Sequence, residues 1–230
     1  MKKESVSFFF PAYFDAKSIP ILTKKTDAIL KKTGRKYEII IVDDGNTDET
    51  GKVADMLAKK MLNVRAVHHK KNKGYAGTLT TGFATAKNQL VGYTDGDGQY
   101  DIKSLPNLLK EIENADIVTG YRANRAEGFT RVFFHKGYKM VLLAVLGMNF
   151  KDPDCGFKLI RKKVLPKIKP SCKSSFFVAE MLYKAKRNGL RIKEIPVKHL
   201  PREFGKSKCF KPTEIIAMGK DVLATRFGKK

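Results

Sequence analysis

The first 120 residues of the chain alternate between short strand-like runs and longer helical patterns, and this alternation constrains the fold more than any other feature. The strand-like runs are rich in β-branched and aromatic residues. They cover Val6–Phe10, Glu38–Val42, Val64–His68, Leu90–Thr94 and Asp116–Gly120. Helical patterns fill the gaps, over Ser18–Lys32, Asp48–Leu62, Ala76–Lys87 and Ile102–Glu113. Strands that alternate with helices predict the α/β class, with a mainly parallel central sheet flanked by helices.

Two aspartates end the fourth strand-like run. The sequence there reads Leu90-Val-Gly-Tyr-Thr-Asp95-Gly-Asp97-Gly-Gln99. Parallel sheets bind their ligands at the carboxyl ends of the strands, so we expect both carboxylates on a binding rim. Neighbouring carboxylates repel each other unless a cation lies between them, and Mg²⁺ or Mn²⁺ prefers such oxygen ligands. The alternative is an ordinary polar Asp-Gly turn after a strand.

The segments Pro11-Ala12-Tyr13 and Asp43-Asp44-Gly45 follow the first and second strands in the same way. Because the carboxyl ends of parallel strands meet at one edge, these residues should converge with Asp95 and Asp97. The first strand is not followed by a glycine-rich dinucleotide fingerprint, and the sequence contains no P-loop.

The chain of 230 residues has a formal net charge of +23, and this charge is uneven. Residues 1–120 hold 19 Lys and Arg against 15 Asp and Glu, whereas residues 121–230 hold 27 against 8. The excess indicates an anionic partner for the second half: nucleic acid, a phosphorylated small molecule or an anionic membrane surface. A solvated basic surface without a partner is the alternative. A hydrophobic content of 42% argues against disorder.

The second half is less regular. We expect helices over Val132–Gly147 and Phe176–Arg187, a strand over Arg191–Pro196 and a mobile basic loop over residues 197–211. An amphipathic helix over Glu214–Phe227 would then end the chain. The residues that could share its apolar face are Ile215, Met218, Val222 and Leu223. This helix either packs on its own domain or a second subunit, or docks on a membrane surface.

Four motifs, in this order, resemble glycosyltransferase family 2. They are Pro11-Ala12-Tyr13-Phe14-Asp15, Val42-Asp43-Asp44-Gly45, Asn72-Lys73-Gly74-Tyr75-Ala76-Gly77 and Asp95-Gly-Asp97-Gly-Gln99. Motifs of the second half are similar to the polyprenyl-phosphate branch, which includes dolichyl-phosphate mannosyltransferase. They are Gly120-Tyr-Arg122, Arg131, Asp154-Cys-Gly156-Phe157-Lys158 and Arg202-Glu-Phe-Gly205-Lys206-Ser207-Lys208. Lys158 stands where many relatives have Arg.

The resemblance implies a single GT-A type, nucleotide-sugar-binding catalytic domain over residues 1–211, followed by the C-terminal helix over 212–230. It implies inverting transfer of a hexose from a GDP- or UDP-sugar, with Mg²⁺ or Mn²⁺ as cofactor. The implied metal site is Asp95, Asp97 and Gln99. The implied nucleotide-sugar site is Pro11, Tyr13, Asp15, Asp43, Gly74 and Asp95. Asp97, Arg202 and Lys208 would act in catalysis, the two basic residues by clamping the diphosphate.

The acceptor decides whether the reaction needs a base. A polyprenyl phosphate is already ionised near neutral pH and needs only positive charge, for which Arg122 and Arg131 are the candidates. A hydroxyl of a glycan or glycolipid would need a general base, and Asp154 is the candidate. The alternative is that Asp154 is only a turn residue in Asp152-Pro-Asp154.

The resemblance implies a peripheral location at the cytoplasmic face of a membrane. No signal peptide is expected, because Met1-Lys-Lys-Glu-Ser runs directly into a strand. The three cysteines lack metal-ligand spacing and fit a reducing compartment. The expected partners are a nucleotide sugar, a polyprenyl phosphate and an anionic membrane surface, with a membrane-anchoring subunit left open. Nucleic-acid binding is a separate hypothesis that the charge alone supports, and we expect no such partner because the chain has no nucleic-acid module.

Overall fold

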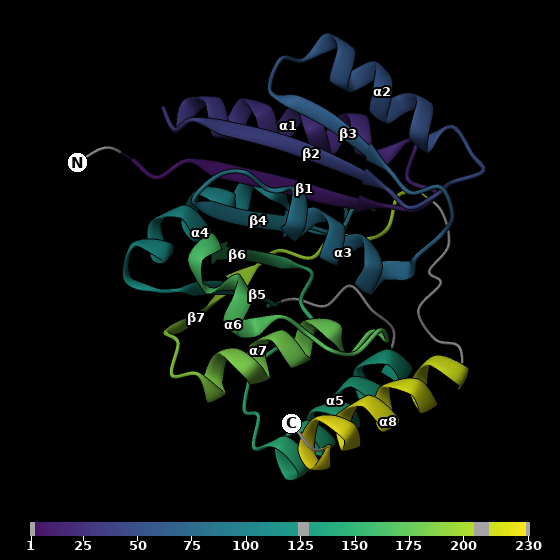
Figure 1. The fold of residues 1–230 in the computed structure, drawn as a ribbon, viewed down its shortest axis with the longest axis vertical. Coiled ribbons are helices and arrows are strands. Elements are labelled where there is room, and N and C mark those ends of the chain that lie inside the picture. The colour runs from purple at the N-terminus through teal and green to yellow at the C-terminus, as the bar shows by residue number, and fades with distance from the viewer. Residues whose placement is uncertain (1–2, 124–128, 205–211, 229–230) are drawn as a thin grey trace.

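The computed structural model describes residues 3–123, 129–204 and 212–228, and for residues 129–136 and 212 it describes the backbone alone. The described residues form one seven-stranded sheet in the order β3-β2-β1-β4-β6-β5-β7 (Figure 1). The strands are β1 (Val6–Ala12), β2 (Tyr37–Asp43), β3 (Val64–His68), β4 (Leu90–Thr94), β5 (Ile117–Arg122), β6 (Phe157–Arg161) and β7 (Ile192–Val197). Every neighbouring pair is parallel except the two pairs that β6 makes with β4 and β5.

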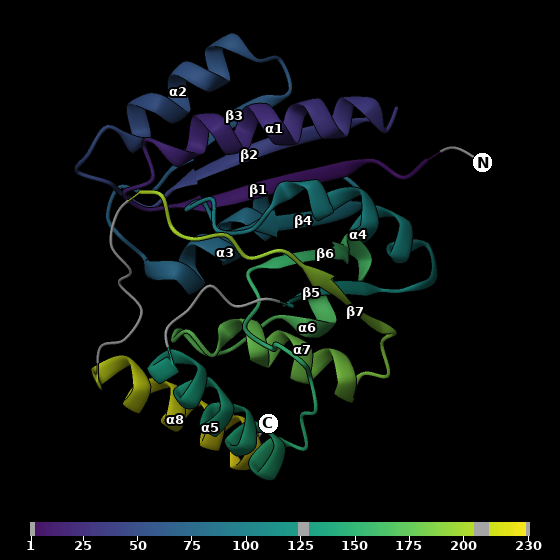
Figure 2. The ribbon, with the colours of Figure 1, turned by 180° about the vertical axis from the view of Figure 1, so that it is seen from behind.

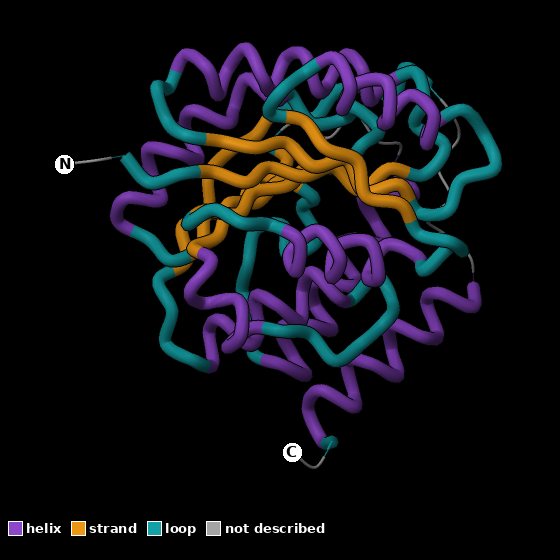
Figure 3. Tube along the Cα trace, turned by 45° about the horizontal axis from the view of Figure 1, so that its top comes forward, coloured by secondary structure: helices purple, strands orange, loops and turns teal. Residues whose placement is uncertain are grey.

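Helices cover both faces of the sheet (Figure 3). One apolar cluster contains residues of α1 (Ser18–Lys32), α2 (Thr50–Lys60) and α4 (Leu105–Glu111). A second cluster contains residues of α3 (Gly74–Thr85), α5 (Phe129–Leu146), α6 (Leu165–Ile168), α7 (Phe177–Arg187) and α8 (Pro212–Phe227). The sheet therefore lies between two helix layers, with α1 and α2 at one end of the molecule and α5 and α8 at the other (Figure 2).

Strand β1 shows why the central strands are apolar throughout. All seven of its residues are buried. Successive side chains of a strand point to opposite faces, so Phe8 and Phe10 join the first cluster whereas Phe9 joins the second. A strand covered on both faces therefore needs a continuous apolar run rather than an alternating one.

The structure confirms the single α/β domain and all five strands expected in the first half, with ends shifted by up to two residues. It adds β6, which the sequence analysis did not assign. Lys158 lies in the middle of that strand and is fully buried. A lysine in this position is atypical of a central strand, which obscured the pattern. The expected Ile102–Glu113 helix is also divided, because 3-10 turns over Ile102–Ser104 and Ile112–Asn114 flank α4.

The apolar face expected for the last helix is only partly right. In α8, Val222 is buried and Met218 packs against the second cluster, but Ile215 and Leu223 are each about half exposed. The helix contacts α5, and fewer of its apolar residues are buried than the sequence pattern predicted.

Candidate active site

The carboxyl end of β4 brings Asp95 and Asp97 to the sheet rim. Tyr75 of α3 donates its hydroxyl to Asp95 Oδ1 at 2.7 Å. Burial, followed by the nearby charge of Asp97, raises the pKa of Asp95 to about 7. The turn after residue 152 passes so close that a Cβ at Gly156 would overlap the Asp95 carboxylate. Glycine at 156 thus makes room for the carboxylate.

Asp97 links the rim to a segment more than a hundred residues later. Arg202 Nη2 lies 2.5 Å from Asp97 Oδ2, and the Gln99 N–H donates to Asp97 Oδ1 at 2.9 Å. The pair is largely shielded from solvent, with Asp97 14% and Arg202 26% exposed. Arg202 therefore lies at the carboxylates.

The backbone holds the first part of the late basic loop in place. The Leu200 N–H donates to Gln99 O at 2.7 Å, and Tyr100 and His199 form an antiparallel bridge. The Gln99 amide nitrogen also donates to Leu200 O at 3.4 Å. The expectation of a mobile loop from residue 197 onward is therefore wrong for residues 197–200, because these hydrogen bonds fasten them to the rim.

The loop after β1 contributes Pro11, Tyr13 and Asp15. The Tyr13 N–H donates to Asp15 Oδ2 at 2.9 Å, and Pro11 O accepts from the Gly96 N–H at 3.2 Å. Burial and the charge of Asp97 raise the pKa of Asp15 to about 6, against the lowering effect of the Tyr13 N–H. Asp15 thus joins Asp95 and Asp97 as a third carboxyl group at the same rim.

Phe14 has a positive φ of 61°, which is uncommon for a residue with a side chain. Its N–H donates to Asn46 Oδ1 at 2.7 Å, and its ring meets that of Tyr13 at 4.6 Å between centroids. Both rings are about 40% exposed. The turn therefore presents an aromatic pair beside the carboxylates, of which the sequence analysis assigned only Tyr13 to the site.

Asp43 is buried at the end of β2, and its carboxylate already has partners. Oδ2 lies 2.9 Å from His68 Nδ1, and Oδ1 accepts from the Asn46 side-chain amide. His68 ends β3 directly beside Asp43, and its Nε2 lies 3.0 Å from Asp55 Oδ1. The hydrogen bond to Asp43 raises the pKa of His68. Sequence analysis did not assign His68 to the site, although two parallel strands ending in Asp43 and His68 were the available signal.

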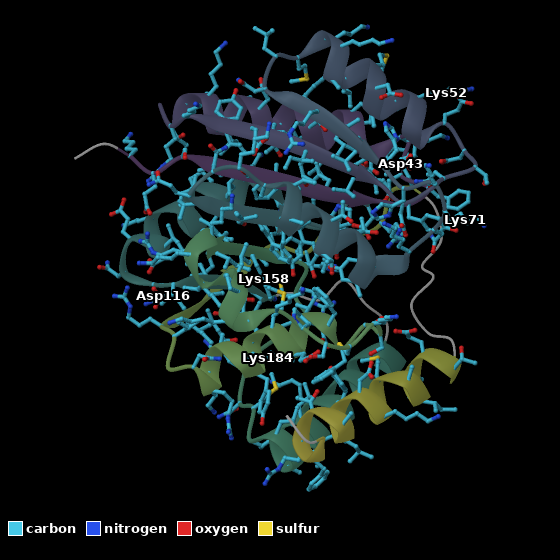
Figure 4. The ribbon with its side chains drawn as sticks, in the orientation of Figure 1. Asp43, Lys52, Lys71, Asp116, Lys158 and Lys184 are labelled. Atoms are coloured by element: carbon cyan, nitrogen blue, oxygen red, sulfur yellow. The ribbon has the colours of Figure 1, made fainter. Side chains whose placement is uncertain are left out.

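Asp44 fixes the turn that leads into α3. Its Oδ1 accepts from the Lys73 N–H at 2.8 Å and lies 2.7 Å from His69 Nδ1. Gly74 follows with a φ of +74°, a conformation that favours glycine. Figure 4 shows Asp43 and Lys71 at the same end of the molecule.

A second group of charges surrounds the turn between α5 and β6. Arg122 makes a two-point contact with Asp152, from Nε to Oδ2 at 2.7 Å and from Nη2 to Oδ1 at 2.9 Å. Asp154 lies 3.5 Å from the Tyr138 hydroxyl, and burial together with the charge of Asp152 raises the pKa of Asp154 to about 7. The Lys158 ammonium donates to Cys155 O, which directly follows this turn, at 2.6 Å. Burial lowers the pKa of Lys158.

Two expected residues cannot be placed. Lys208 lies outside the described residues, and so does the side chain of Arg131. The remaining predicted residues divide into two groups. Arg122 and Asp154 lie at the turn of residues 152–154. Those at the rim are Pro11, Tyr13, Asp15, Asp43, Gly74, Asp95, Asp97, Gln99 and Arg202.

The donor chemistry of the rim fits a hard divalent cation. Asp95 and Asp97 are oxygen donors of the kind that Mg²⁺ and Mn²⁺ prefer. The charge of Asp97 adds to the effect of burial in raising the pKa of Asp95. Across the described residues, no group of three or more His, Cys, Asp or Glu side chains has metal-site geometry. A cation here would therefore need oxygen from other sources, such as Gln99, water or a phosphate.

The chain matches the family Glycosyl transferase family 2 over residues 7–169 and belongs to that family. The family prediction is thereby confirmed.

Curated relatives fall in the polyprenyl-phosphate branch. The undecaprenyl-phosphate 4-deoxy-4-formamido-L-arabinose transferase of Klebsiella pneumoniae is 30% identical over 207 residues, which is 89% of this chain and 62% of that protein. The dodecaprenyl-phosphate galacturonate synthase of Rhizobium johnstonii is 28% identical over 88% of this chain and 61% of its own length. The chain thus spans about six-tenths of the length of these relatives.

Among solved structures, the chain resembles glucosyl-3-phosphoglycerate synthase from Mycobacterium tuberculosis in complex with Mn²⁺, UDP and phosphoglyceric acid. The TM-score is 0.72 at 19% identity, covering 96% of this chain and 77% of that one. This likeness establishes the fold. Separately, no helix in the described parts of the chain is both long and apolar enough to cross a bilayer.

Proposed function

We propose that this protein transfers a hexose from a nucleotide sugar to a polyprenyl phosphate, with inversion and with a divalent cation as cofactor. The observation that carries the proposal is the contact between Arg202 and Asp97 beside Asp95, at the carboxyl end of β4 in a family 2 fold. The two curated relatives named above act, by their names, with undecaprenyl and dodecaprenyl phosphates.

The rim residues hold the donor. Asp95 and Asp97, with Gln99, would hold the cation, and a bound cation would offset the negative charge that develops on the departing nucleoside diphosphate. Arg202 supplies a forked contact for the same diphosphate, and Lys208 supplies a point charge. For Arg202 to reach the phosphates it must share or leave Asp97, so donor binding should loosen that pair. Pro11, Tyr13, Asp15, Asp43 and Gly74 surround the base, ribose and sugar.

The acceptor approaches from the turn at residues 152–154. Its phosphate is the nucleophile and attacks the anomeric carbon as the bond to the diphosphate breaks. No proton acceptor is needed for an ionised phosphate. Arg122 and Arg131 provide positive charge, and Asp152 fixes the orientation of the Arg122 guanidinium.

One observation favours a second candidate, transfer to a hydroxyl of a glycan or glycolipid. The pKa of Asp154 is about 7, which suits a general base at neutral pH. Asp154→Asn separates the two candidates: it should abolish transfer to a hydroxyl and leave transfer to a phosphate largely intact.

The location and organisation of the protein follow from the acceptor. A lipid-linked phosphate requires action at a membrane surface, and we assign this action to the cytoplasmic face. We extend the proposal to a catalytic unit over residues 1–211, with the C-terminal helix over 212–230 as a packing or membrane-surface element. A membrane-anchoring subunit is compatible with this arrangement.

A transfer assay tests the proposal. Purified protein is incubated with radiolabelled UDP- or GDP-hexoses, polyprenyl phosphate and Mn²⁺ or Mg²⁺, and labelled lipid is extracted and counted. The proposal predicts labelled lipid with at least one donor, and its loss on adding EDTA. Absence of labelled lipid with every donor and both metals would reject it.

A further inference from the structure

His68 joins two carboxylates that belong to different elements. Its Nδ1 lies 2.9 Å from Asp43 Oδ2 at the end of β2, and its Nε2 lies 3.0 Å from Asp55 Oδ1 on α2. The side chain of Asp43 is 8% exposed, that of His68 is 39% exposed and that of Asp55 is 58% exposed. The imidazole therefore connects a buried carboxylate of the rim to a carboxylate that solvent reaches.

The contacts of the ring depend on its protonation. A carboxylate accepts hydrogen bonds, whereas a neutral imidazole has a proton on just one of its two nitrogens. With a carboxylate at each nitrogen, both contacts of His68 are hydrogen bonds when the ring is imidazolium. The hydrogen bond to Asp43 raises the pKa of His68 against the effect of burial, and Asp55 raises it further. The fold thus keeps this ring charged to a higher pH than an isolated histidine.

The Asp43 carboxylate is held from several sides. Its Oδ1 accepts from the Asn46 side-chain amide and, at 3.4 Å, from the Asn46 N–H. A Cβ at Gly51 of α2 would come within 2.9 Å of Asp43 Oδ2 and 3.7 Å of His68 Nδ1, so α2 packs closely over the pair. Oδ1 has two donors and Oδ2 has one, so an acceptor position remains on Oδ2. The position of His68 therefore sets the direction in which that oxygen can accept from a ligand.

A cavity of about 540 Å³ adjoins His68, a size that suits a small-molecule site. Its lining residues are His68, His69, Lys70, Lys71, Asn72 and Lys73. The lysines of this lining are cations and oppose a charge on the ring, whereas on α2 Lys52 is paired with Glu49. Asp43, Lys52 and Lys71 all lie at the same end of the molecule (Figure 4). Asp43 and Asp55 are therefore the groups that favour the charged ring.

We propose that His68 is a positioning residue for the donor: as imidazolium it orients the Asp43 carboxylate toward the bound nucleotide, and its deprotonation weakens donor binding. The statement rests on the proposed function in one respect, the place of Asp43 beside the base or ribose. When the ring loses a proton, two carboxylates compete for its one remaining N–H, so the hold on Asp43 weakens. Donor affinity should be highest below the pKa of His68 and fall as the pH rises through it.

Two variants and a control test the positioning. His68→Gln keeps an N–H donor for Asp43 but carries no charge. Asp55→Asn keeps an acceptor for the ring but removes one of the two charges that retain its proton. Glu49→Gln is the matched control for Asp55→Asn, because Glu49 is an exposed carboxylate beside the start of α2 that pairs with Lys52 instead.

Calorimetry with UDP-glucose and GDP-mannose, in Mg²⁺ at pH 6.0 and pH 8.5, measures the Kd of the donor. At pH 6.0, His68→Gln should bind about tenfold more weakly than the wild type, the effect of one hydrogen bond to a charged group. At pH 8.5 the two proteins should differ by less than about threefold. Asp15, Asp95 and Asp154 titrate in both proteins, so the ratio of the two Kd values isolates His68.

Proton NMR follows the ring itself. The His68 resonances are assigned by their absence from the spectrum of His68→Gln. Their titration midpoint should fall by about 0.5 pH unit or more in Asp55→Asn and stay unchanged in Glu49→Gln. The pH at which donor affinity falls should move with the midpoint, a coupling that a purely structural role of His68 would not produce.

Three results would overturn the positioning: equal donor affinity of His68→Gln and wild type at pH 6.0, a ratio of Kd values that does not change with pH, or a His68 midpoint that Asp55→Asn leaves in place. Failure of the proposed function has a different signature. A wild type that binds a sugar nucleotide with the expected pH dependence but labels no polyprenyl phosphate would reject the transfer reaction and keep the positioning. A wild type that binds neither sugar nucleotide would reject both.

Discussion

Asp97 has two partners that lie at very different distances along the chain. The Gln99 N–H belongs to the same turn, whereas Arg202 lies 105 residues further on. Only the first contact could be predicted from local sequence. The second places a guanidinium beside a carboxylate, and we propose that this pair exchanges partners when a cation and a diphosphate bind.

The variant Asp97→Asn tests that role. Asparagine keeps the shape but removes the charge that holds both Arg202 and the cation. We expect kcat/KM for the sugar nucleotide to fall by about 10²-fold or more, the usual cost of removing a group that stabilises developing charge. Initial rates with a radiolabelled donor measure the effect. Asp101→Asn is the matched control, since that carboxylate accepts from the Lys103 N–H instead, and a similar loss in the control would contradict the role.

Asp154 should make stability depend on pH. Its pKa is about 7 in the folded protein against an ordinary value of 3.8, so the folded state binds more protons between these values. The contribution to the free energy of unfolding is therefore fully present below pH 4 and is lost as the pH rises through 7. The expected loss is ~1–3 kcal/mol, because one pKa unit corresponds to about 1.4 kcal/mol and solvent screening reduces the full value.

Urea unfolding at pH 5 and pH 8 measures this loss. The wild type should lose more stability between the two values than Asp154→Asn, which cannot ionise. Asp95 titrates in the same range in both proteins, so the difference between them isolates Asp154. Equal losses in the two proteins would show that Asp154 ionises freely.

At the scale of elements, packing decides what a helix tolerates. In α3, a Cβ at Gly82 would overlap the Phe9 ring of β1, whereas in α8 a Cβ at Gly219 would meet nothing within 4 Å. The two helices contain similar glycines in sequence, and only the neighbouring strand makes one of them obligatory. The close approach of α3 to β1 holds the Asp44 turn and Tyr75 near the rim.

This contrast predicts opposite effects of the same substitution. Gly82→Ala should lower the free energy of unfolding by about 1–3 kcal/mol, because the core is overpacked. Gly219→Ala should raise it by about 0.5–1 kcal/mol, because alanine is the better helix former and the site is open. Chemical denaturation of both variants gives the values. A stable Gly82→Ala variant would mean that α3 can move away from the sheet.

At the scale of the whole molecule, the site exists only because distant segments meet. The rim combines the ends of β1, β2 and β4 with Arg202, and the acceptor-side turn combines β5, α5 and the segment before β6. The anionic ligand expected there balances part of a net charge of +23. Ligand binding should therefore stabilise the molecule as a unit.

A thermal-shift experiment tests this linkage and the need for metal. A correct sugar nucleotide at 100 times its Kd should raise Tm by about 5–10 °C with Mn²⁺ present, since the stabilisation is about 2.7 kcal/mol. Without metal the shift should be small, because Asp95 and Asp97 repel the diphosphate. In Asp97→Asn the metal-dependent part should vanish. An equal shift in EDTA would show that the donor binds without a cation.

The sequence by itself determined the α/β alternation, the strands that end in acids and the family to which the chain belongs, because these depend on local periodicity and on short motifs. Tertiary structure alone decided the place of β6, with its buried Lys158, and the contacts of Arg202 with Asp97, Arg122 with Asp152 and His68 with Asp43. It also decided which side of α8 is covered. The physical reason is that these contacts join segments whose separation along the chain carries no information about their distance in space, and only the packing of the sheet and its two helix layers sets that distance.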